Sequence, residues 1–371
     1  MKKFLDCISI VGATPSKFHG TKKYISTGAV ATTEIDESEV VEVTYEDRPS
    51  RANLSAEAGD ILFAKMQGTR KTLLLDSETE KNIYSTGFYA VRANPEVITT
   101  ECLYYLIDSE LFLAQKDKNC SGATQKAITN GGMAKIEISV PPLSEQGILV
   151  DKLKHLTQLI ADKKKQLNLF DEIIKSRFIE MFGDPKRNPR KWDMVTVGDI
   201  ATDVRYGTSR PATEGGKYPY LRMNNLTYEG YLDLTDLKHI DIPDNEVEKC
   251  VVRNGDVLFN RTNSVELVGK TCVYNLDSDM IIAGYIIRVR IDDRVLPVIL
   301  SSYLNSTVMK EQLRSMAKGA VNQANINAQE LRSIPIYLPP ITLQHEFATF
   351  VEQVDKSKYH GEFTCEMEVA A

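Results

Sequence analysis

Four short stretches of this chain combine lysine or arginine with asparagine, glutamine, serine, threonine and glycine. They cover residues 17–23 and 65–71 in the first half and 205–210 and 260–263 in the second half. Cationic side chains bind phosphate groups, while amide and hydroxyl groups form hydrogen bonds with the edges of bases. A single stretch of this kind is most simply a solvated turn. Two in each half of the chain favour a surface that reads the sequence of double-stranded DNA.

Residues 122–128 and 222–225 have a similar polar and basic composition. Gln125 and its second-half counterpart Gln323 have a second interpretation, because a residue that recurs in both halves also suits a loop-bracing role. The predicted DNA contacts are Lys22, Lys23, Lys65, Gln67, Thr69, Arg70, Lys71, Thr124, Gln125, Lys126, Arg205, Thr208, Ser209, Arg210, Arg222, Asn224, Asn225, Asn260, Arg261, Thr262 and Asn263.

The sequence offers no catalytic constellation to accompany these loops. It has no Asn/Asp-Pro-Pro-aromatic motif of the amino-methyltransferases, and residues 264–271 miss the first glycine of a P-loop, so we expect a strand and a turn there. The five histidines are scattered, and the six cysteines form no C-x-x-C pair. We therefore expect reduced thiols, no metal, no cofactor and no enzymatic activity in this chain.

The basic loops belong to an internal repeat with a period of about 196 to 198 residues. Between the matching segments the two copies differ strongly, so one scaffold carries two different surfaces. This arrangement suits a ligand with two unlike parts. The matching segments are Gly59–Phe63 with Gly255–Phe259, Thr86–Tyr89 with Ala283–Ile286, residues 122–128 with 319–326, and Val140–Gln146 with Leu338–Gln344.

A long helix is predicted to follow the first copy. Ser144 is its expected N-cap and Gly183 with Pro185 its stop, which gives about 38 residues or roughly 57 Å. A second helix, with Thr342 as its expected N-cap, starts in the same way after the second copy, but its pattern ends near Lys358. The apolar seams have alternating spacings of four and three, as in coiled coils. They comprise Leu149, Leu153, Leu156, Ile160, Leu167, Phe170, Ile174 and Phe178, and then Phe347, Phe350 and Val354.

Each half is predicted to be an α+β domain, because short strands bounded by glycine and polar turns precede helical patterns at residues 103–107 and 298–304. The two helices should run antiparallel as a coiled-coil-like spacer, which relates the domains by a pseudo-twofold axis. The expected boundaries are 1–140 for the first domain, 141–183 for the long spacer helix, 184–192 for a linker, 193–338 for the second domain, 339–360 for the shorter helix and 361–371 for a disordered tail.

Composition agrees with two ordinary domains and limits the cellular context. With 371 residues and 42% hydrophobic content, each half is long enough to bury its own core. No apolar segment of membrane-spanning length exists, and Asp6 interrupts any signal-like start, so we expect a soluble cytoplasmic protein. The net charge of −6 does not exclude a basic face, because acidic residues cluster between Glu34 and Asp60.

These motifs together resemble the specificity subunit of type I restriction-modification systems. The resemblance rests on Pro141–Gln146, on Arg177–Pro185, on Asn188–Trp192 and on the repeated Gly-Asp-(Ile/Val)-Leu-Phe and Gly-Ala elements, and it covers nearly the whole chain. It implies two target-recognition domains on a helical spacer in a prokaryotic cytoplasm. Each domain would read one part of an interrupted, asymmetric DNA site. The implied partners are two methylating subunits docked along the helices and a restriction subunit that also translocates DNA.

The second helix of this chain is shorter than the one usual in that family. This difference bears on the length of the helix pair and on the docking of one methylating subunit. The alternative is a two-domain protein-interaction adaptor that binds no DNA, which the acidic pI of about 5.6 favours.

Overall fold

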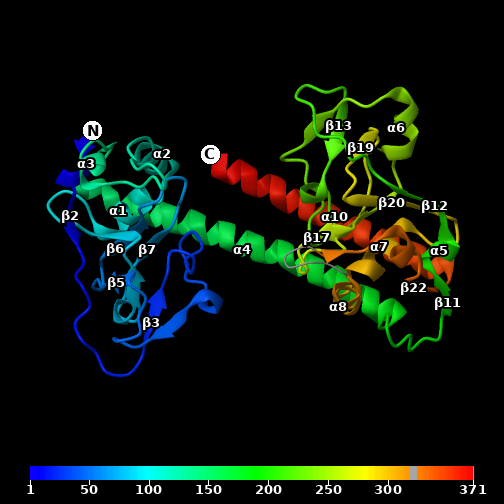
Figure 1. The fold of residues 1–371 in the computed structure, drawn as a ribbon, viewed down its shortest axis with the longest axis horizontal. Coiled ribbons are helices and arrows are strands. Elements are labelled where there is room, and N and C mark those ends of the chain that lie inside the picture. Colours follow the sequence, from blue (N-terminus) through cyan, green and yellow to red (C-terminus); the bar gives the residue numbers. More distant parts are fainter. Residues whose placement is uncertain (318–323, 371) are drawn as a thin grey trace. The chain divides into compact units, whose positions relative to one another are not determined.

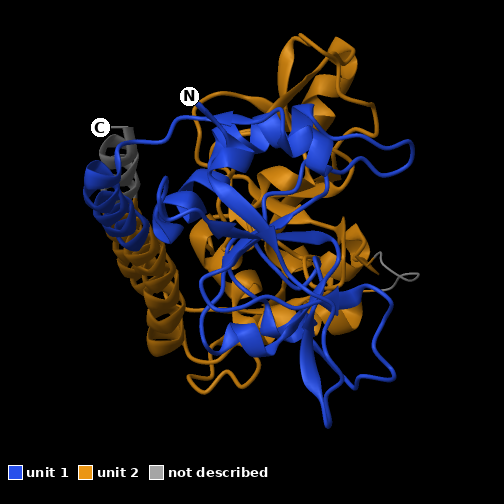
Figure 2. Ribbon diagram, turned by 90° about the vertical axis from the view of Figure 1, so that its left-hand side faces the viewer, with its two compact units in different colours: residues 1–159 blue, residues 160–371 orange. Residues whose placement is uncertain are grey.

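The computed structural model describes residues 1–317 and 324–370, with side chains described as far as residue 358. The chain divides into two compact units, residues 1–159 (unit 1) and 160–371 (unit 2), which are coloured separately in Figure 2. Gln323 and most of its loop lie outside the described residues. Among the helices of the described part, none is both long enough and apolar enough to cross a membrane.

Unit 1 is built from two four-stranded sheets and one short strand pair (Figure 1). The first sheet has the order β2-β9-β6-β7 and is fully antiparallel, and the second has the order β4-β3-β8-β5 with β3 parallel to β8. Helices α1 and α2 bury their apolar side chains, among them Leu103 and Phe112, against Phe4 and Phe63. The elements are β1 (Lys2–Lys3), β2 (Ile8–Val11), β3 (Lys22–Ile25), β4 (Val41–Val43), β5 (Ala52–Leu54), β6 (Ile61–Ala64), β7 (Thr72–Leu74), β8 (Ile83–Ser85), β9 (Phe88–Ala93), α1 (Thr100–Ile107), α2 (Glu110–Lys118), α3 (Asn130–Met133) and β10 (Glu137–Ile138).

Unit 2 repeats the sheet topology of unit 1 and adds the short strand pair β17-β21. Its sheets have the orders β12-β20-β16-β18 and β14-β13-β19-β15, with β13 parallel to β19, and the pair β11-β22 corresponds to β1-β10. The elements are β11 (Asp193–Thr196), α5 (Val197–Ile200), β12 (Ala201–Tyr206), β13 (Tyr218–Leu221), β14 (Lys238–Ile240), α6 (Asp244–Cys250), β15 (Val251–Val252), β16 (Val257–Asn260), β17 (Thr262–Asn263), β18 (Thr271–Val273), β19 (Met280–Ile282), β20 (Ile286–Ile291), α7 (Pro297–Asn305), α8 (Thr307–Met316), β21 (Ala324–Asn325), α9 (Ala328–Arg332) and β22 (Pro335–Leu338). The predicted duplication and the α+β class are confirmed.

The repeated Gly-Asp pairs have a structural role. Gly59 and Gly255 adopt φ values of +87° and +90°, which disfavour any residue with a side chain. The buried carboxylates that follow accept hydrogen bonds from Arg92 and Arg290 on the neighbouring strand, at 2.6 Å for Asp60 and 2.9 Å for Asp256. The pair thus turns the chain into the central strand of the first sheet.

One repeated segment aligns differently in space. Ala64 pairs with Phe88 in unit 1, and Asn260 pairs with Ile286 in unit 2. The alignment of Thr86–Tyr89 with Ala283–Ile286 is therefore wrong by one residue, because the second copy has two more residues between its central strands and the alignment allowed for one.

A buried glutamine explains why the Pro-Pro segment recurs. Gln146 accepts the backbone N–H of Thr99 at 2.7 Å and donates to the carbonyl groups of Val97 and Pro141. Gln344 makes the equivalent three bonds to Leu296, Arg294 and Pro339 at 2.8 to 3.0 Å. Each glutamine thereby fixes the start of a long helix against the segment that leads into α1 or α7.

Replacing Gln344 with leucine should lower the free energy of unfolding by about 1–3 kcal/mol, because it leaves buried backbone groups without hydrogen-bond partners. Urea unfolding of the purified chain would measure the loss. Gln353→Leu is the matched control, since Gln353 is exposed on the same helix; it should change stability by no more than about 0.5 kcal/mol. Equal effects of the two substitutions would contradict this role.

Helices α4 (Leu143–Phe182) and α10 (Ile341–Ala370) begin directly after their Pro-Pro pairs, so the predicted N-caps Ser144 and Thr342 lie inside the first turn. Helix α10 continues through residues 361–370, where we expected a disordered tail. No proline interrupts that segment, so nothing in it forbids a helical backbone.

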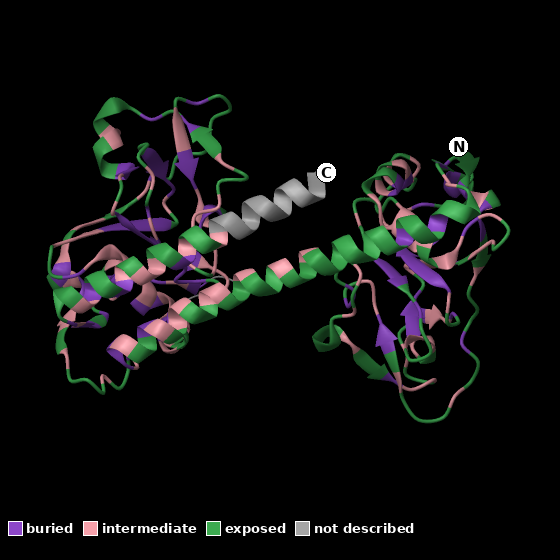
Figure 3. Cartoon of the chain, turned by 180° about the vertical axis from the view of Figure 1, so that it is seen from behind, coloured by how far each residue is buried: buried purple, intermediate pink, exposed green. Residues whose placement is uncertain are grey.

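The helical seam is covered in unit 2. Phe178 and Phe182 contact Phe347, with ring centroids 5.4 and 5.5 Å apart. Arg177 contacts Phe350, and Asp171 pairs with Lys358. Because positions lower in α4 meet positions higher in α10, the two helices run antiparallel here. Ile174 also joins this core, Val354 is buried, and Ile160, Leu167, Phe170 and Phe350 are half-buried. In unit 1, Leu149, Leu153 and Leu156 are each 39% exposed. Figure 3 shows the exposed faces of α4 in green.

Candidate nucleic-acid interface

Three predicted loops of unit 2 meet at one open groove. They follow the strands β12, β13 and β16, and Tyr285 and Gly284 complete the lining. The backbone segments approach one another closely. The N–H of Gly284 donates to the carbonyl of Thr208 at 2.7 Å. Gly207 has no room for a side chain, because a Cβ there would lie 2.1 Å from the carbonyl oxygen of Ile282. The predicted contact residues that line this groove are Thr208, Ser209, Arg210, Arg222, Asn224 and Arg261.

Most arginines around the groove are already paired with carboxylates. Arg210 forms a two-pronged ion pair with Glu246 at 2.7 and 3.0 Å, Arg222 pairs with Asp236 at 2.7 Å, and Arg205 pairs with Asp203 at 2.8 Å. Such exposed pairs contribute little stability and weaken with salt. A nucleic acid would have to displace these carboxylates to engage the guanidinium groups.

Arg261 differs from these arginines. Its guanidinium lies 4.9 Å from the ring centroid of Tyr206 and has no carboxylate partner among the described residues. Its Nε is buried without an acceptor. Its backbone is held on both sides, because its N–H donates to Tyr285 and its carbonyl accepts from Ile326, each at 2.9 Å. A half-buried planar donor on a fixed backbone is suited to bind an incoming acceptor.

Lys65 occupies the same scaffold position in unit 1. It directly follows β6 as Arg261 follows β16, its N–H donates to Gly87, and its carbonyl accepts from Ile128, again each at 2.9 Å. Its ammonium group lies 4.3 Å from the ring centroid of Tyr89 and donates to the carbonyl of Thr86. Partial burial lowers the pKa of Lys65. Both units therefore present a cation on a tyrosine at one equivalent position.

The neighbouring loops of unit 1 form a second polar cluster. The N–H of Gln67 donates to the carbonyl of Lys126 at 3.0 Å, and the side-chain amide of Gln125 lies 3.4 Å from the sulfur of Met66. Thr124, Gln125 and Lys126 are exposed. Lys65 and the loops that contain Gln67 and Gln125 thus converge at one edge of the sheet.

The other basic residues predicted in unit 1 have intramolecular partners. Arg70 pairs with Asp108 and Glu110, each at 2.8 Å, and Lys23 pairs with Glu37 at 2.7 Å. Lys22 lies 5.2 Å from the ring centroid of Phe18, and half-buried Thr69 accepts a hydrogen bond at its carbonyl from the buried Lys116.

Several predicted residues brace the fold rather than face the solvent. Lys71 donates to the carbonyl of Thr27 at 2.6 Å, and its counterpart Lys270 binds the carbonyl of Met223 in the same way. The buried residues Asn225, Asn260 and Thr262 are held by internal hydrogen bonds, and half-buried Asn263 donates to Asn260. Thr208 is also buried and accepts at its carbonyl.

Sequence reasoning missed the tyrosines of the site. Tyr285 lines the groove and is 50% exposed, whereas Tyr206 is 42% exposed and lies against Arg261. In unit 1, the ammonium group of Lys65 lies over the ring of Tyr89. The available signal was the alternation of aromatic and basic residues, such as Arg205 followed by Tyr206. Exposed aromatic rings beside cations provide flat contact surfaces for ligands.

This fold and site define a class of protein: two copies of one α+β unit, joined through a long helix, with loop surfaces of different composition on a shared scaffold. The sequence matches the family described as the type I restriction modification DNA specificity domain over residues 10–169 and again over residues 189–361. The chain belongs to this family.

Named relatives agree with this assignment. The type I restriction enzyme EcoKI specificity subunit of Escherichia coli (strain K12) is 24% identical over 72% of this chain and 61% of its own length. The StySPI specificity subunit of Salmonella potsdam is 23% identical over 80% of this chain and 67% of its own length. The chain thus spans about two thirds or less of these relatives. Both are named as specificity subunits, in agreement with the prediction of a non-catalytic subunit.

Solved structures support the fold. The chain is similar to a component of a type I R-M system structure, with a TM-score of 0.54, 20% identity, and coverage of 98% of this chain and 94% of that one. It is also similar to the type I restriction-modification S subunit from M. genitalium, with a TM-score of 0.50, 12% identity, and coverage of 98% and 91%.

Proposed function

We propose that this chain is the specificity subunit of a type I restriction-modification complex and recognises a bipartite, asymmetric site on double-stranded DNA. Each unit reads one half-site. The observation that supports this most directly is the equivalent position of Lys65 and Arg261, where one scaffold offers chemically different cations. Lysine acts as a point charge, whereas arginine can bind guanine through two parallel hydrogen bonds. Because the two units carry different side chains on the same scaffold, we expect them to recognise different half-sites.

The proposed contact set is narrower than the sequence prediction. In unit 2 it comprises the groove residues Ser209, Arg210, Arg222, Asn224 and Arg261. In unit 1 it comprises Lys65, Gln67, Thr124, Gln125 and Lys126. Four predicted residues are left out of this set because their side chains form hydrogen bonds within the protein and so are not free to bind DNA bases. They are Lys71, Asn225, Asn260 and Thr262.

The chain acts without a cofactor and without catalysis of its own. Its partners are two methylating subunits and a restriction subunit that translocates DNA, assembled in a prokaryotic cytoplasm. Helix α4 sets the distance between the half-sites, because it is one 40-residue helix in which the division between the two units falls. Helix α10 packs its apolar seam antiparallel against α4 and so stabilises α4.

Co-purification with the methylating subunit encoded beside this chain tests the assembly, and methylation mapping with that complex tests the DNA site. A complex that forms but neither binds nor methylates DNA would favour the adaptor alternative.

Arg261→Ala should weaken binding of the assembled complex to its site by about 1–3 kcal/mol and relax one half-site only. The reason is the loss of a preorganised guanidinium that has no carboxylate competitor. Lys65→Ala should act on the other half-site. Equilibrium binding to a library of sites, at several salt concentrations, gives both affinity and preference.

Arg205→Ala is the matched control, since Arg205 pairs with Asp203 outside the groove lining; we expect a small effect there. A uniform loss with a shallower salt dependence would assign Arg261 to a phosphate contact. Unchanged binding after Arg261→Ala would remove this loop from the interface.

A further inference from the structure

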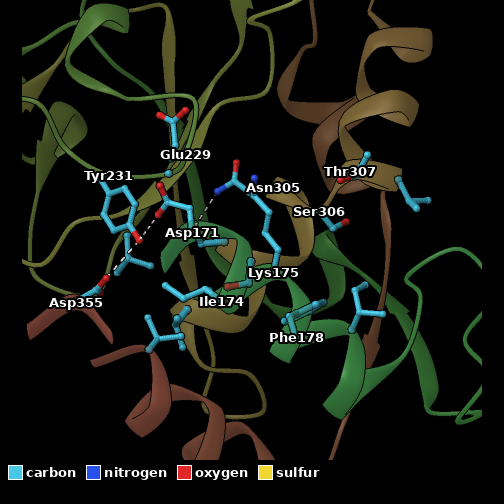
Figure 4. Close-up of a pocket in the computed structure, with 18 of the residues that line it drawn as sticks. Asp171, Ile174, Lys175, Phe178, Glu229, Tyr231, Asn305, Ser306, Thr307 and Asp355 are labelled. Atoms are coloured by element: carbon cyan, nitrogen blue, oxygen red, sulfur yellow. Dashed lines mark hydrogen bonds between the residues drawn. The ribbon is translucent and has the colours of Figure 1, made fainter. Parts of the chain in front are cut away.

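Unit 2 contains a pocket of 360 Å³ on the side formed by α4, α7, α8 and α10. Ile174, Phe178, Val298, Val308 and Val351 give it apolar walls. Figure 4 shows Glu229, Tyr231 and Asp355 on one side of this pocket, and Ser306 and Thr307 on the other. None of these residues belongs to the proposed DNA contact set, so the pocket is a separate feature.

A second hollow adjoins this pocket, and we call the two together the trough. Asp184 and Val308 line both hollows, while Lys186, Arg187 and Gln312 line only the second one. A depression that extends past the pocket in this way suits a segment of polypeptide better than a compact small molecule.

The two ends of the trough differ in charge. At the first end, Glu229 is exposed and forms no ion pair within the described part of the chain, and Asp355 accepts a hydrogen bond from Tyr231 at 3.3 Å. Lys358 pairs instead with Asp171, at 2.7 Å. Burial raises the pKa of the Asp355 carboxyl, while the nearby Lys358 ammonium group and the Tyr231 hydroxyl act in the opposite direction. A cation from a partner would stabilise this end.

At the second end the exposed side chains carry both signs of charge, with two basic residues and one acidic residue. Lys186 and Arg187 form no ion pair with any described residue, although Glu311 also lines this hollow. The carboxylate of Asp184 is occupied locally, because one of its oxygens accepts the backbone N–H groups of both residues at 2.9 and 3.0 Å. The side chains of Lys186 and Arg187 are therefore available to an external acid.

The walls of the trough are firmly held. The Tyr231 hydroxyl lies 3.1 Å from Asp171 on α4 and 3.3 Å from Asp355 on α10, and the ammonium group of Lys358 lies 3.9 Å from the centroid of the Tyr231 ring. A preformed pocket lowers the cost of ordering the protein on binding.

We infer that this trough is a docking site for a protein segment that places an apolar side chain between α4, α8 and α10, a lysine or arginine against Glu229 and Asp355, and an acidic residue against Lys186 and Arg187. The occupant is a segment of the methylating subunit, so this inference rests on the proposed function. The negative end and the apolar walls make DNA a poor occupant. An apolar anchor in a pocket with charged contacts at its rim is the usual anatomy of a binding hot spot.

The test measures binding of the purified full chain to the methylating subunit encoded beside it, by titration calorimetry. Glu229→Lys and Arg187→Glu should each weaken the complex about tenfold. Ser302→Trp, which fills the pocket from α7, should weaken it by about a hundredfold or more. Matched reversals on the exposed surface elsewhere in unit 2, Glu214→Lys and Lys249→Glu, should leave the affinity within about twofold. Thermal unfolding of each variant checks the fold, and the two charge reversals decide the matter if Ser302→Trp does not fold.

A photo-reactive amino acid in place of the exposed Thr307 should crosslink to one segment of the methylating subunit, with a basic residue, an apolar residue and an acidic residue in its sequence. If the unmodified chain binds the methylating subunit and the trough variants bind equally well, the trough is not the docking site and the proposed function stands. If the unmodified chain does not bind that subunit at all, the proposed function fails and the trough assignment fails with it.

Discussion

Replacing residues 193–338 with the matching segment of a family member should give a folded protein in which one half-site is changed and the other is kept. The two ends of this segment meet in space, because β11 and β22 pair and Asp193 lies opposite Leu338. Because the two ends of the exchanged segment are paired, the flanking residues 192 and 339 can keep their positions after the exchange. Methylation mapping with the assembled complex would show which half-site has changed.

The donor segment must retain the contacts that join it to the helices. Tyr337 donates to the carbonyl of Gly183 at 3.0 Å, and the residues at positions 294 and 296 must present their backbone to Gln344. A donor that lacks Tyr337 would leave a buried carbonyl without its partner. The donor should therefore be a family member that has a tyrosine at the position of Tyr337.

The reciprocal exchange of residues 1–138 is the matched control, since Lys2 lies opposite Ile138 in the equivalent strand pair of unit 1. It should change only the other half-site. A change of both half-sites in either exchange would mean that the units read DNA jointly, and the interpretation of the duplication as two independent readers would be wrong.

The repeat made the fold predictable to a large extent. Glycines with positive φ, such as Gly59 and Gly255, and the buried glutamines Gln146 and Gln344 are short-range devices that leave the same pattern in both copies. The pairing of β3 with β8 in parallel could not be predicted, because it joins strands nearly sixty residues apart without a local signal. The end of α4 at Phe182 agrees with the predicted stop at Gly183. The starts of α4 and α10 and the end of α10 were missed, since no capping residue marks either start and no breaker marks the end of α10.

The site was only partly predictable for a different reason. Composition identified the loop that contains Arg261, but it could not show that Arg210 is paired with Glu246, which lies 36 residues away. It also could not distinguish Asn224, which is exposed, from Asn225, which is buried and bonded to Asp233. Burial and partner choice depend on tertiary contacts, whereas residue type alone defines only what a side chain is able to bind.

Inserting residues into α4 near Lys164 should lengthen the preferred gap between the half-sites. Four added residues extend the helix by about 6 Å, which equals roughly two base pairs at about 3.4 Å per step. Lys164 is exposed, and the insertion point lies within the spacer helix just after the division between the units. Selection from a library of sites with randomised spacers would report the preferred gap of the assembled complex.

Two variants separate helix length from helix packing. A four-residue insertion interrupts the seam between Ile160 and Leu167 and should cost some affinity, whereas seven residues preserve the heptad phase. The seven-residue insertion extends the helix by about 10.5 Å and should add roughly three base pairs. Four residues inserted at the exposed turn of Glu214 and Gly215 are the control, because they lengthen the chain but not the helix. If both helix insertions leave the gap unchanged while both half-sites are still recognised, α4 does not set the spacing between the half-sites.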